Sequence, residues 1–332
     1  MSSPAMAARN TLRRSLLYVP GSSQRFLDKS RSLAADCLTY DLEDSVTPHM
    51  KAEARSLVRR AIDQPTPSNI RKRAVRINSV DSGLALGDLT EVLQSPNLTT
   101  IVIPKVNSAS DLTFVTDVIN HTLAQQKNQS PEARPPISLS PLSNPLNPLT
   151  NLTQICSSTP LLQGLIFAAE DFALDLSITR TPSLTEFLFA RSAIATAARA
   201  AELPSTIDLV CTAYKSDKAD GSPPATLEEE CRDGRRLGFN GKQCIHPTQV
   251  KTANAIFGPD EEETRWAVRV VIADEKAAAA GRGAWTLDGK MIDVPVAEKA
   301  RLLLGRQLPV GLMLRSCRKS GSIRSLNRAF FL

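Results

Sequence analysis

The stretch LLQGLIFAAED, Leu161–Asp171, decides how the rest of the chain is interpreted. Its first half is mostly apolar, and two adjacent carboxylates, Glu170 and Asp171, end it. A short apolar run of this kind is typical of a strand that is buried on both faces. Acids that directly follow such a strand are typical of the active face of an α/β barrel. The alternative is that the two acids open the next helix, because the helix dipole favours acidic residues in its first turn.

Seven further strand-like runs accompany this one, and they alternate with helix-like segments such as Ser183–Glu202 and Leu227–Leu237. This alternation predicts right-handed crossovers and a parallel sheet, and eight strands predict closure into a (β/α)8 TIM barrel. The fifth run lies in residues 130–148, which hold six of the 22 prolines, and proline is rare in central strands. The expected strands are Ser15–Pro20, Cys37–Glu43, Ala74–Asn78, Thr99–Lys105, Ile137–Leu142, Leu162–Asp171, Thr206–Thr212 and Lys242–Pro247.

The basic surplus of the chain lies at its two ends. The formal net charge is +6, but residues 1–14 and 301–332 together hold ten Lys and Arg and no acid. The part between them carries 30 basic and 34 acidic residues, a net charge of −4, which argues against a nucleic acid as partner. No apolar run approaches the length of a membrane span, so we expect no membrane association. The six cysteines form no CxxC pair, which predicts a reducing compartment and no zinc site.

We expect four parts along the chain. Residues 1–12 form a disordered or targeting leader, residues 13–258 the barrel, residues 259–304 a C-terminal helical extension, and residues 305–332 an atypical tail without acids. The leader contains arginine, Ser and Ala but no acid, as mitochondrial presequences do. We therefore expect a mitochondrial location, with a cytoplasmic location as the alternative.

Charged residues gather where the expected strands end. The second strand ends in Asp41, Glu43 and Asp44, Lys105 ends the fourth, and the paired acids described above end the sixth. Polar groups at the C-terminal ends of barrel strands are typical of catalysis. Arg76 lies inside the apolar run AVRIN, and burying a guanidinium requires an anionic partner. That partner is either the carboxylate of a ligand, which we favour, or a structural acid.

Seven segments, taken in order, resemble the citrate lyase β-subunit family, which includes the malyl-CoA and citramalyl-CoA lyases. The resemblance spans residues 13–303 and implies a (β/α)8 barrel that forms homotrimers. It also implies a Mg²⁺-dependent lyase or synthase that breaks or forms a C–C bond between an acyl-CoA thioester and a small keto or hydroxy acid. The segments are RRSLLYVPGSSQRFLDKS (13–30), TYDLEDSV (39–46), AVRIN (74–78), IPKV (103–106), AAEDF (168–172), GFNGKQCIHPTQV (238–250) and MIDVPVAEKA (291–300).

The resemblance also implies roles for individual residues. Arg76 would bind the substrate carboxylate, and Asp171 would ligate Mg²⁺ with Glu170 beside it as an orienting acid. Asp293, in the MID segment, would be the proton-transfer residue and would reach the barrel of a neighbouring subunit.

The same resemblance places further residues at the substrate. Gly21, in the YVPGS turn, and the acids Glu43 and Asp44 would border the acyl-thioester site. Lys105 is an additional candidate for substrate binding.

One departure from the family concerns the metal. The family has a glutamate after the fifth strand as a second Mg²⁺ ligand, whereas LSPLSNPLNP, residues 139–148, contains no acid and aligns Asn144 there. Both this segment and the tail after Gly305 can be back-translated into codons that encode a family-like sequence when they are read in a neighbouring frame. We therefore hypothesise that both segments are read in a shifted frame, and we expect weak Mg²⁺ binding and impaired activity. The alternatives are an aldolase that acts on a free 2-keto acid and a non-catalytic homologue that binds acyl-CoA.

Overall fold

The computed structural model describes residues 13–129, 136–143, 148–215, 223–258, 261–279, 281 and 284–305. Within them, eight parallel strands close into a barrel in chain order, which confirms the expected TIM barrel. The leader at residues 1–12, Asn144 and the tail after Gly305 lie outside the described residues. The strands are β1 (Ser15–Pro20), β2 (Cys37–Asp41), β3 (Lys72–Arg76), β4 (Thr100–Val106), β5 (Ser138–Ser143), β6 (Gly164–Phe167), β7 (Ser205–Val210) and β8 (Gly241–Cys244).

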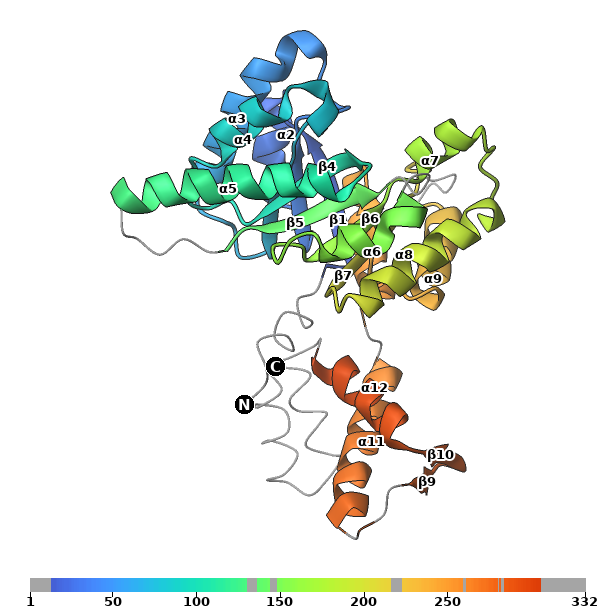
Figure 1. Ribbon diagram of the computed structural model, residues 1–332. Helices are drawn as coiled ribbons and strands as arrows, with labels where there is room; N and C mark the ends of the chain where they lie inside the picture. Colours follow the sequence, from blue (N-terminus) through green and yellow to red (C-terminus); the bar gives the residue numbers. More distant parts are fainter. Residues whose placement is uncertain are drawn as a thin grey trace. The chain divides into compact units, whose positions relative to one another are not determined.

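Helices connect these strands and cover the outside of the barrel (Figure 1). The longer ones are amphipathic: α3, for example, buries Ala54, Leu57, Val58 and Ile62 on one face. The α-helices are α2 (Gln24–Ser30), α3 (Lys51–Asp63), α4 (Ala85–Val92), α5 (Ala109–Gln129), α6 (Pro148–Ser157), α7 (Ala169–Leu176), α8 (Leu188–Ala200), α9 (Ala225–Arg236) and α10 (Pro247–Ile256). Three short 3₁₀ helices are η1 (Pro48–Met50), η2 (Val80–Ser82) and η3 (Thr185–Phe187).

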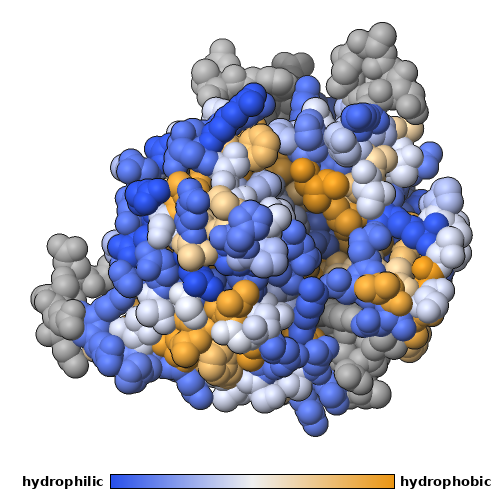
Figure 2. Space-filling model, turned by 90° about the horizontal axis from the view of Figure 1, so that it is seen from above, coloured by the Kyte–Doolittle hydropathy of each residue, from blue (hydrophilic) through white to orange (hydrophobic). Residues whose placement is uncertain are grey.

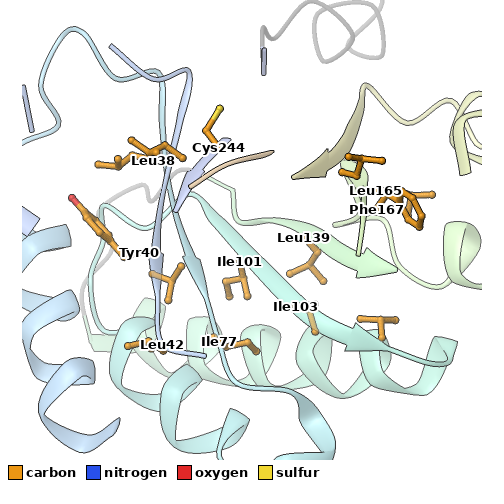
Figure 3. Packing of buried hydrophobic residues seen from close by; sticks show 14 of the residues in the cluster. Leu38, Tyr40, Leu42, Ile77, Ile101, Ile103, Leu139, Leu165, Phe167 and Cys244 are labelled. Atoms are coloured by element: carbon orange, nitrogen blue, oxygen red, sulfur yellow. The ribbon is translucent and has the colours of Figure 1, made fainter. Parts of the chain in front are cut away.

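Alternate residues of each strand serve two different cores. Cys37 and Ala74 point into the barrel, where they pack with Leu16, Val102 and Ile166. Their neighbours point outward and form the larger core between the strands and the helices. Figure 3 shows part of this outer core, with Leu38, Tyr40, Ile77, Ile101 and Leu165 among the labelled residues. Because the barrel interior is filled by side chains, open space for a ligand is expected at the strand ends rather than along the barrel axis.

Strand β5 forms despite its proline. Pro141 lies opposite Ile103 of β4, and the register of the β4–β5 pair shifts between Ile103 and Val106. Proline cannot donate a hydrogen bond to a neighbouring strand, so it is tolerated where the ladder is already irregular. This irregularity explains how a proline occurs in a strand with neighbours on both sides.

The chain divides into two compact units, and the larger one is Arg13–Phe257. The described part of the smaller unit begins at Gly258 and contains α11 (Glu261–Ala279), an antiparallel hairpin of β9 (Trp285–Leu287) and β10 (Lys290–Ile292), and α12 (Val294–Gly305). Val268, Val271, Ile292, Ala297 and Leu304 belong to its own apolar core. Among the described residues, no helix combines the length and the apolar character that crossing a membrane requires.

Candidate active site

An ion pair between neighbouring strands forms one wall of the site. Asp41 and Arg76 are partners in the register of β2 and β3. The Nε and Nη2 atoms of Arg76 donate to the two carboxylate oxygens of Asp41, at 2.7 and 2.6 Å. The guanidinium also lies 4.7 Å from the centre of the Tyr18 ring, within the range of a cation–π contact. Of the two kinds of partner that the sequence allowed for Arg76, the structure therefore contains the structural acid.

Asp41 is held on its other side by its own turn. Its carboxylate also accepts hydrogen bonds from the backbone N–H groups of Glu43 and Ser45, at 2.9 and 3.1 Å, and from the Ser45 hydroxyl, at 2.5 Å. Burial works to raise the pKa of Asp41, but the bonds and charge of Arg76, together with Ser45 and the backbone, lower it below its ordinary value. Asp41 is therefore an anion that fixes the guanidinium in place.

One nitrogen of Arg76 makes only ion-pair contacts. The Nη1 atom lies 3.0 Å from Glu43 Oε2 and 3.7 Å from Asp44 Oδ2, but neither contact is an aligned hydrogen bond. Among the described residues, none accepts a hydrogen bond from this nitrogen. Nη1 can therefore donate to an anionic ligand while the other edge of the guanidinium stays on Asp41.

Glu43 is a buried acid between two cations. It is 5% exposed, and its oxygens lie 3.0 Å from Arg76 Nη1 and 3.2 Å from Lys105 Nζ. Burial raises the pKa of Glu43 to about 7, with Asp44 adding to the rise and Arg76 and Lys105 opposing it. This carboxyl group can therefore take up or release a proton near neutral pH.

Lys105 occupies a strained position at the end of β4. Its φ of 50° lies in the left-handed region, which residues other than glycine rarely adopt, and it falls within the register shift of β4. The side chain is half-exposed, and its Nζ reaches Glu43 at 3.2 Å and Asp44 at 3.6 Å. Burial lowers the pKa of Lys105, but Glu43 and Asp44 raise it by more, so the ammonium stays charged. This backbone conformation directs the ammonium group toward Glu43 and Asp44.

The sixth strand ends earlier than the sequence indicated. β6 stops at Phe167, and Glu170 and Asp171 lie in the first turn of α7. The expectation that this strand continues to Asp171 was wrong, because Ala168 and Ala169 extend the apolar pattern while the backbone already turns into a helix. Both acids still lie at the C-terminal end of the strand, and the helix dipole stabilises them there.

The two acids of α7 have different surroundings. Glu170 Oε1 accepts a hydrogen bond from Arg180 at 2.5 Å, and the same guanidinium donates to Glu230 at 2.7 Å and to the Val210 carbonyl at 2.9 Å. No described residue donates a hydrogen bond to the half-buried Asp171. Burial raises the pKa of Asp171, which Lys105 partly offsets. A carboxylate without a donor is suited to a cation, so Asp171 is the better candidate ligand of the two.

Several of these residues line one cavity of about 420 Å³. Of the residues that the sequence indicated, Arg76, Asp44, Glu170 and Asp171 line it, together with Asp41, Tyr18 and Gln243. Figure 2, the view from above Figure 1, shows a hollowed face with apolar and hydrophilic side chains side by side. The cavity thus combines a guanidinium with carboxylates, a set that can hold an anion and a cation together.

The remaining sequence-based candidates lie elsewhere. Glu43 and Lys105 are not among the lining residues, but Lys105 Nζ lies 3.6 Å from Asp44, which is, and 3.2 Å from Glu43. Gly21 donates its N–H to the Asp41 carbonyl at 2.8 Å, and a Cβ there would lie 2.6 Å from that oxygen. Glycine is therefore required for close approach of the backbone to β2. Asp293 is exposed in the smaller unit, where its carboxylate accepts a hydrogen bond from the Val296 N–H at 3.1 Å.

The available ligands suit magnesium without forming a complete cage. Among the described residues, no group of three or more His, Cys, Asp or Glu side chains is arranged to hold a metal ion. Mg²⁺ needs only one or two carboxylates, because it keeps several waters and takes further oxygens from its substrate. Asp171 meets this requirement, with Asp44 on the same cavity.

Three residues at or near the cavity were not individual candidates from the sequence: Tyr18, Arg180 and Gln243. Tyr18 and Gln243 belong to the segments YVPGS and KQCIHP, which were noted for their resemblance only as segments. Arg180 follows α7 in a stretch that reads as an ordinary loop. Each contributes through contacts with residues far away in the chain, which no local pattern reveals.

Comparison with known proteins supports the family resemblance that the sequence motifs indicated. The model of the HpcH/HpaI aldolase/citrate lyase family matches residues 14–247. The citrate lyase subunit beta of Escherichia coli K12 is 34% identical over 307 residues, which cover 92% of this chain and 97% of that protein. The human mitochondrial citramalyl-CoA lyase is 33% identical over 302 residues, 87% of this chain and 84% of that protein.

A solved structure shows the same architecture. The protein CitE from Mycobacterium tuberculosis, in complex with magnesium, acetoacetate and coenzyme A, superposes with a TM-score of 0.69 at 26% identity. The match covers 91% of this chain and 99% of that one. The barrel, the acids and arginine at its mouth and these similarities together show that the chain belongs to the HpcH/HpaI aldolase/citrate lyase family.

Proposed function

We propose that the chain is a Mg²⁺-dependent carbon–carbon lyase or synthase that acts on a hydroxy-acyl-CoA such as citramalyl-CoA, malyl-CoA or a citryl thioester. The observation that carries this proposal is the cavity that is lined by both Arg76 and Asp171, whose carboxylate receives no hydrogen bond from a described residue. A substrate of this class bears a carboxylate for the guanidinium and a neighbouring oxygen that a metal ion can hold. The CitE structure with magnesium, acetoacetate and coenzyme A supports the same ligand classes.

The residues divide the chemistry among them. Arg76 orients the substrate through its carboxylate, while Asp41 keeps the guanidinium from moving. Asp171, with Glu170 or Asp44 nearby, would hold Mg²⁺, which when bound polarises the keto or hydroxy oxygen of the substrate. Gly21, Glu43, Asp44 and Lys105 would border the thioester.

Asp293 would transfer the proton at the carbon next to the thioester. It is exposed, as are Met291 (77%) and Val294 (61%) close to it in the chain, while Ile292 between them is buried. Exposed apolar residues on either side of an acid are suited to packing against a second subunit. In the proposed homotrimer, Asp293 would serve the barrel of a neighbouring subunit. Asp293→Asn should abolish turnover while leaving Mg²⁺ affinity unchanged, and a parallel loss of Mg²⁺ binding would contradict this role.

Thermal melts test the substrate class. In the presence of Mg²⁺, acetyl-CoA should raise the melting temperature more than pyruvate or glyoxylate does, because the thioester has its own contacts. Protection by the free keto acids with no effect of acetyl-CoA would instead support an aldolase that acts on a free 2-keto acid. For the location of the protein we propose the mitochondrion, on the composition of residues 1–12 and with a mitochondrial relative in support.

A further inference from the structure

A buried glutamine, Gln243, forms hydrogen bonds to residues on different strands around the cavity. Gln243 lies on β8, is 5% exposed, and its side chain makes three hydrogen bonds. Its Nε2 donates to the carbonyl of Phe167 at 2.8 Å and to the carbonyl of Asp208 at 3.0 Å. Since these two acceptors use both amide protons, the orientation of the amide is fixed. Its Oε1 accepts a hydrogen bond from the Tyr18 hydroxyl at 3.1 Å.

The two carbonyls belong to places where the barrel ladders are incomplete. The β6–β7 pairing ends at Ile166 opposite Ile207, one residue before Phe167. The β7–β8 register shifts between Asp208 and Val210. The side chain of Gln243, on β8, therefore bonds to both β6 and β7 just beyond their last backbone pair.

The hydrogen-bond partners of Gln243 lie next to the two proposed ligand-binding groups, Asp171 and Arg76. Phe167 is followed directly by Ala168 and by α7, whose first turn presents Asp171 to the cavity. On the other side, the ring of Tyr18 lies 4.7 Å from the guanidinium of Arg76. Burial raises the pKa of Tyr18, so its phenol keeps the proton that it donates to Gln243.

We propose that Gln243 is a positioning residue that fixes the separation between the metal-binding carboxylate of Asp171 and the carboxylate-binding guanidinium of Arg76. This inference rests on the proposed function, because it assumes that these two groups hold the same substrate. A bound carboxylate and a bound metal ion must lie at a defined separation for one small acid to reach both. Gln243 bonds both to the strand that leads to Asp171 and to the tyrosine that lies against Arg76.

The chain contains a matched control. Gln249, in α10, is fully buried, and its Nε2 donates to the carbonyls of Cys211 and Ala213 at 2.9 and 3.0 Å. Its Oε1 accepts from the backbone N–H of Ile245 at 2.9 Å. The His246 N–H also donates to this oxygen, at 3.3 Å. Gln249 is thus a buried amide whose two amide protons bond to backbone carbonyls, as in Gln243, but its bonds lead neither to β6 nor to Tyr18.

The experiment compares Gln243→Met with Gln249→Met in the full-length protein. Methionine keeps the length of the side chain and removes all of its strong hydrogen bonds, so both variants should lower the melting temperature. Mn²⁺, which takes the same oxygen ligands as Mg²⁺, is titrated and followed by electron paramagnetic resonance. Pyruvate is then titrated in the presence of Mn²⁺.

We expect Gln243→Met to weaken both affinities by about tenfold or more, and Gln249→Met to change neither by more than about twofold. Tyr18→Phe removes only the bond on the Arg76 side, so it should weaken pyruvate binding and leave the affinity for Mn²⁺ alone unchanged. Equal affinities in Gln243→Met and Gln249→Met would overturn the positioning role and leave the proposed function standing. A wild-type protein that binds neither Mn²⁺ nor acetyl-CoA would overturn the proposed function, and this inference with it.

Discussion

Replacing Arg76 with methionine tests whether the ion pair at the mouth also stabilises the barrel. The change removes the two hydrogen bonds to Asp41, at 2.6 and 2.7 Å, and leaves a carboxylate that is 0% exposed without its counter-ion. Removing one partner of a buried pair typically costs about 3–5 kcal/mol. Asp41 keeps its bonds to Ser45 and to the Glu43 N–H, so we expect a loss near the lower end, about 3 kcal/mol.

Urea unfolding at neutral pH, followed by far-UV circular dichroism, measures this loss as a change in midpoint at constant slope. Arg76→Lys keeps the charge but only one of the two bonds, so it should lose about 1–2 kcal/mol. In the double variant with Asp41→Asn, the buried charge is gone, and the combined loss should be smaller than the sum of the two single losses by about 2 kcal/mol. Arg76→Met with a stability within about 0.5 kcal/mol of wild type, and no coupling to Asp41, would refute the reasoning.

Three further predictions concern the metal, the pH and the fifth strand. Wild-type protein should bind Mg²⁺ only in the millimolar range and Asp171→Asn should bind none; calorimetry that shows micromolar affinity would contradict this. The pKa of Glu43 is raised from 4.5 to about 7, so its contribution to stability is complete below about pH 4.5 and is lost as the pH rises to about 7. In urea titrations, the free energy of unfolding of Glu43→Gln should therefore rise relative to that of the wild type between about pH 4.5 and 7, and the difference should stay constant above about pH 7. A difference that does not change with pH would argue against the raised pKa. Replacing Leu139–Pro148 with LALIESAKS should raise the free energy of unfolding by more than about 1 kcal/mol and strengthen Mg²⁺ binding. The gain in affinity, but not the gain in stability, should vanish when the new glutamate is changed to Gln, and a segment that improves neither would refute the shifted-frame hypothesis.

The strands could be predicted because their signal is local. Short strand-like runs mark the approximate positions of all eight, although β5 (SLSPLS) and β8 (GKQC) contain few apolar residues, and β1 has the bounds that the sequence indicated. The end of β6 could not be read in the same way, because alanine fits both a buried strand and a helix. The tertiary structure decides there, and Ala169 becomes the first residue of α7.

The sequence predicts what chemical type of partner a site residue needs, but not which residue that partner is. The sequence shows that a buried Arg76 needs an anion, but the choice of Asp41 follows from the register of β2 against β3. Gln243 reaches a backbone carbonyl 76 residues away, and backbone carbonyls have no signature in the sequence. Such contacts are set by the closure of the barrel, and only a three-dimensional structure shows them.

The division of the chain into two units also separates its natural fluorophores. Both tryptophans, Trp266 in α11 and Trp285 in β9, belong to the smaller unit, whereas all three tyrosines, Tyr18, Tyr40 and Tyr214, belong to the barrel unit. Emission excited at the red edge of the indole band therefore reports on the smaller unit alone, and no label is needed. Energy transfer from tyrosine to tryptophan depends on how closely the two units approach each other, within a chain or between chains. A dilution series of that transfer would show whether the approach occurs inside one subunit or only on assembly.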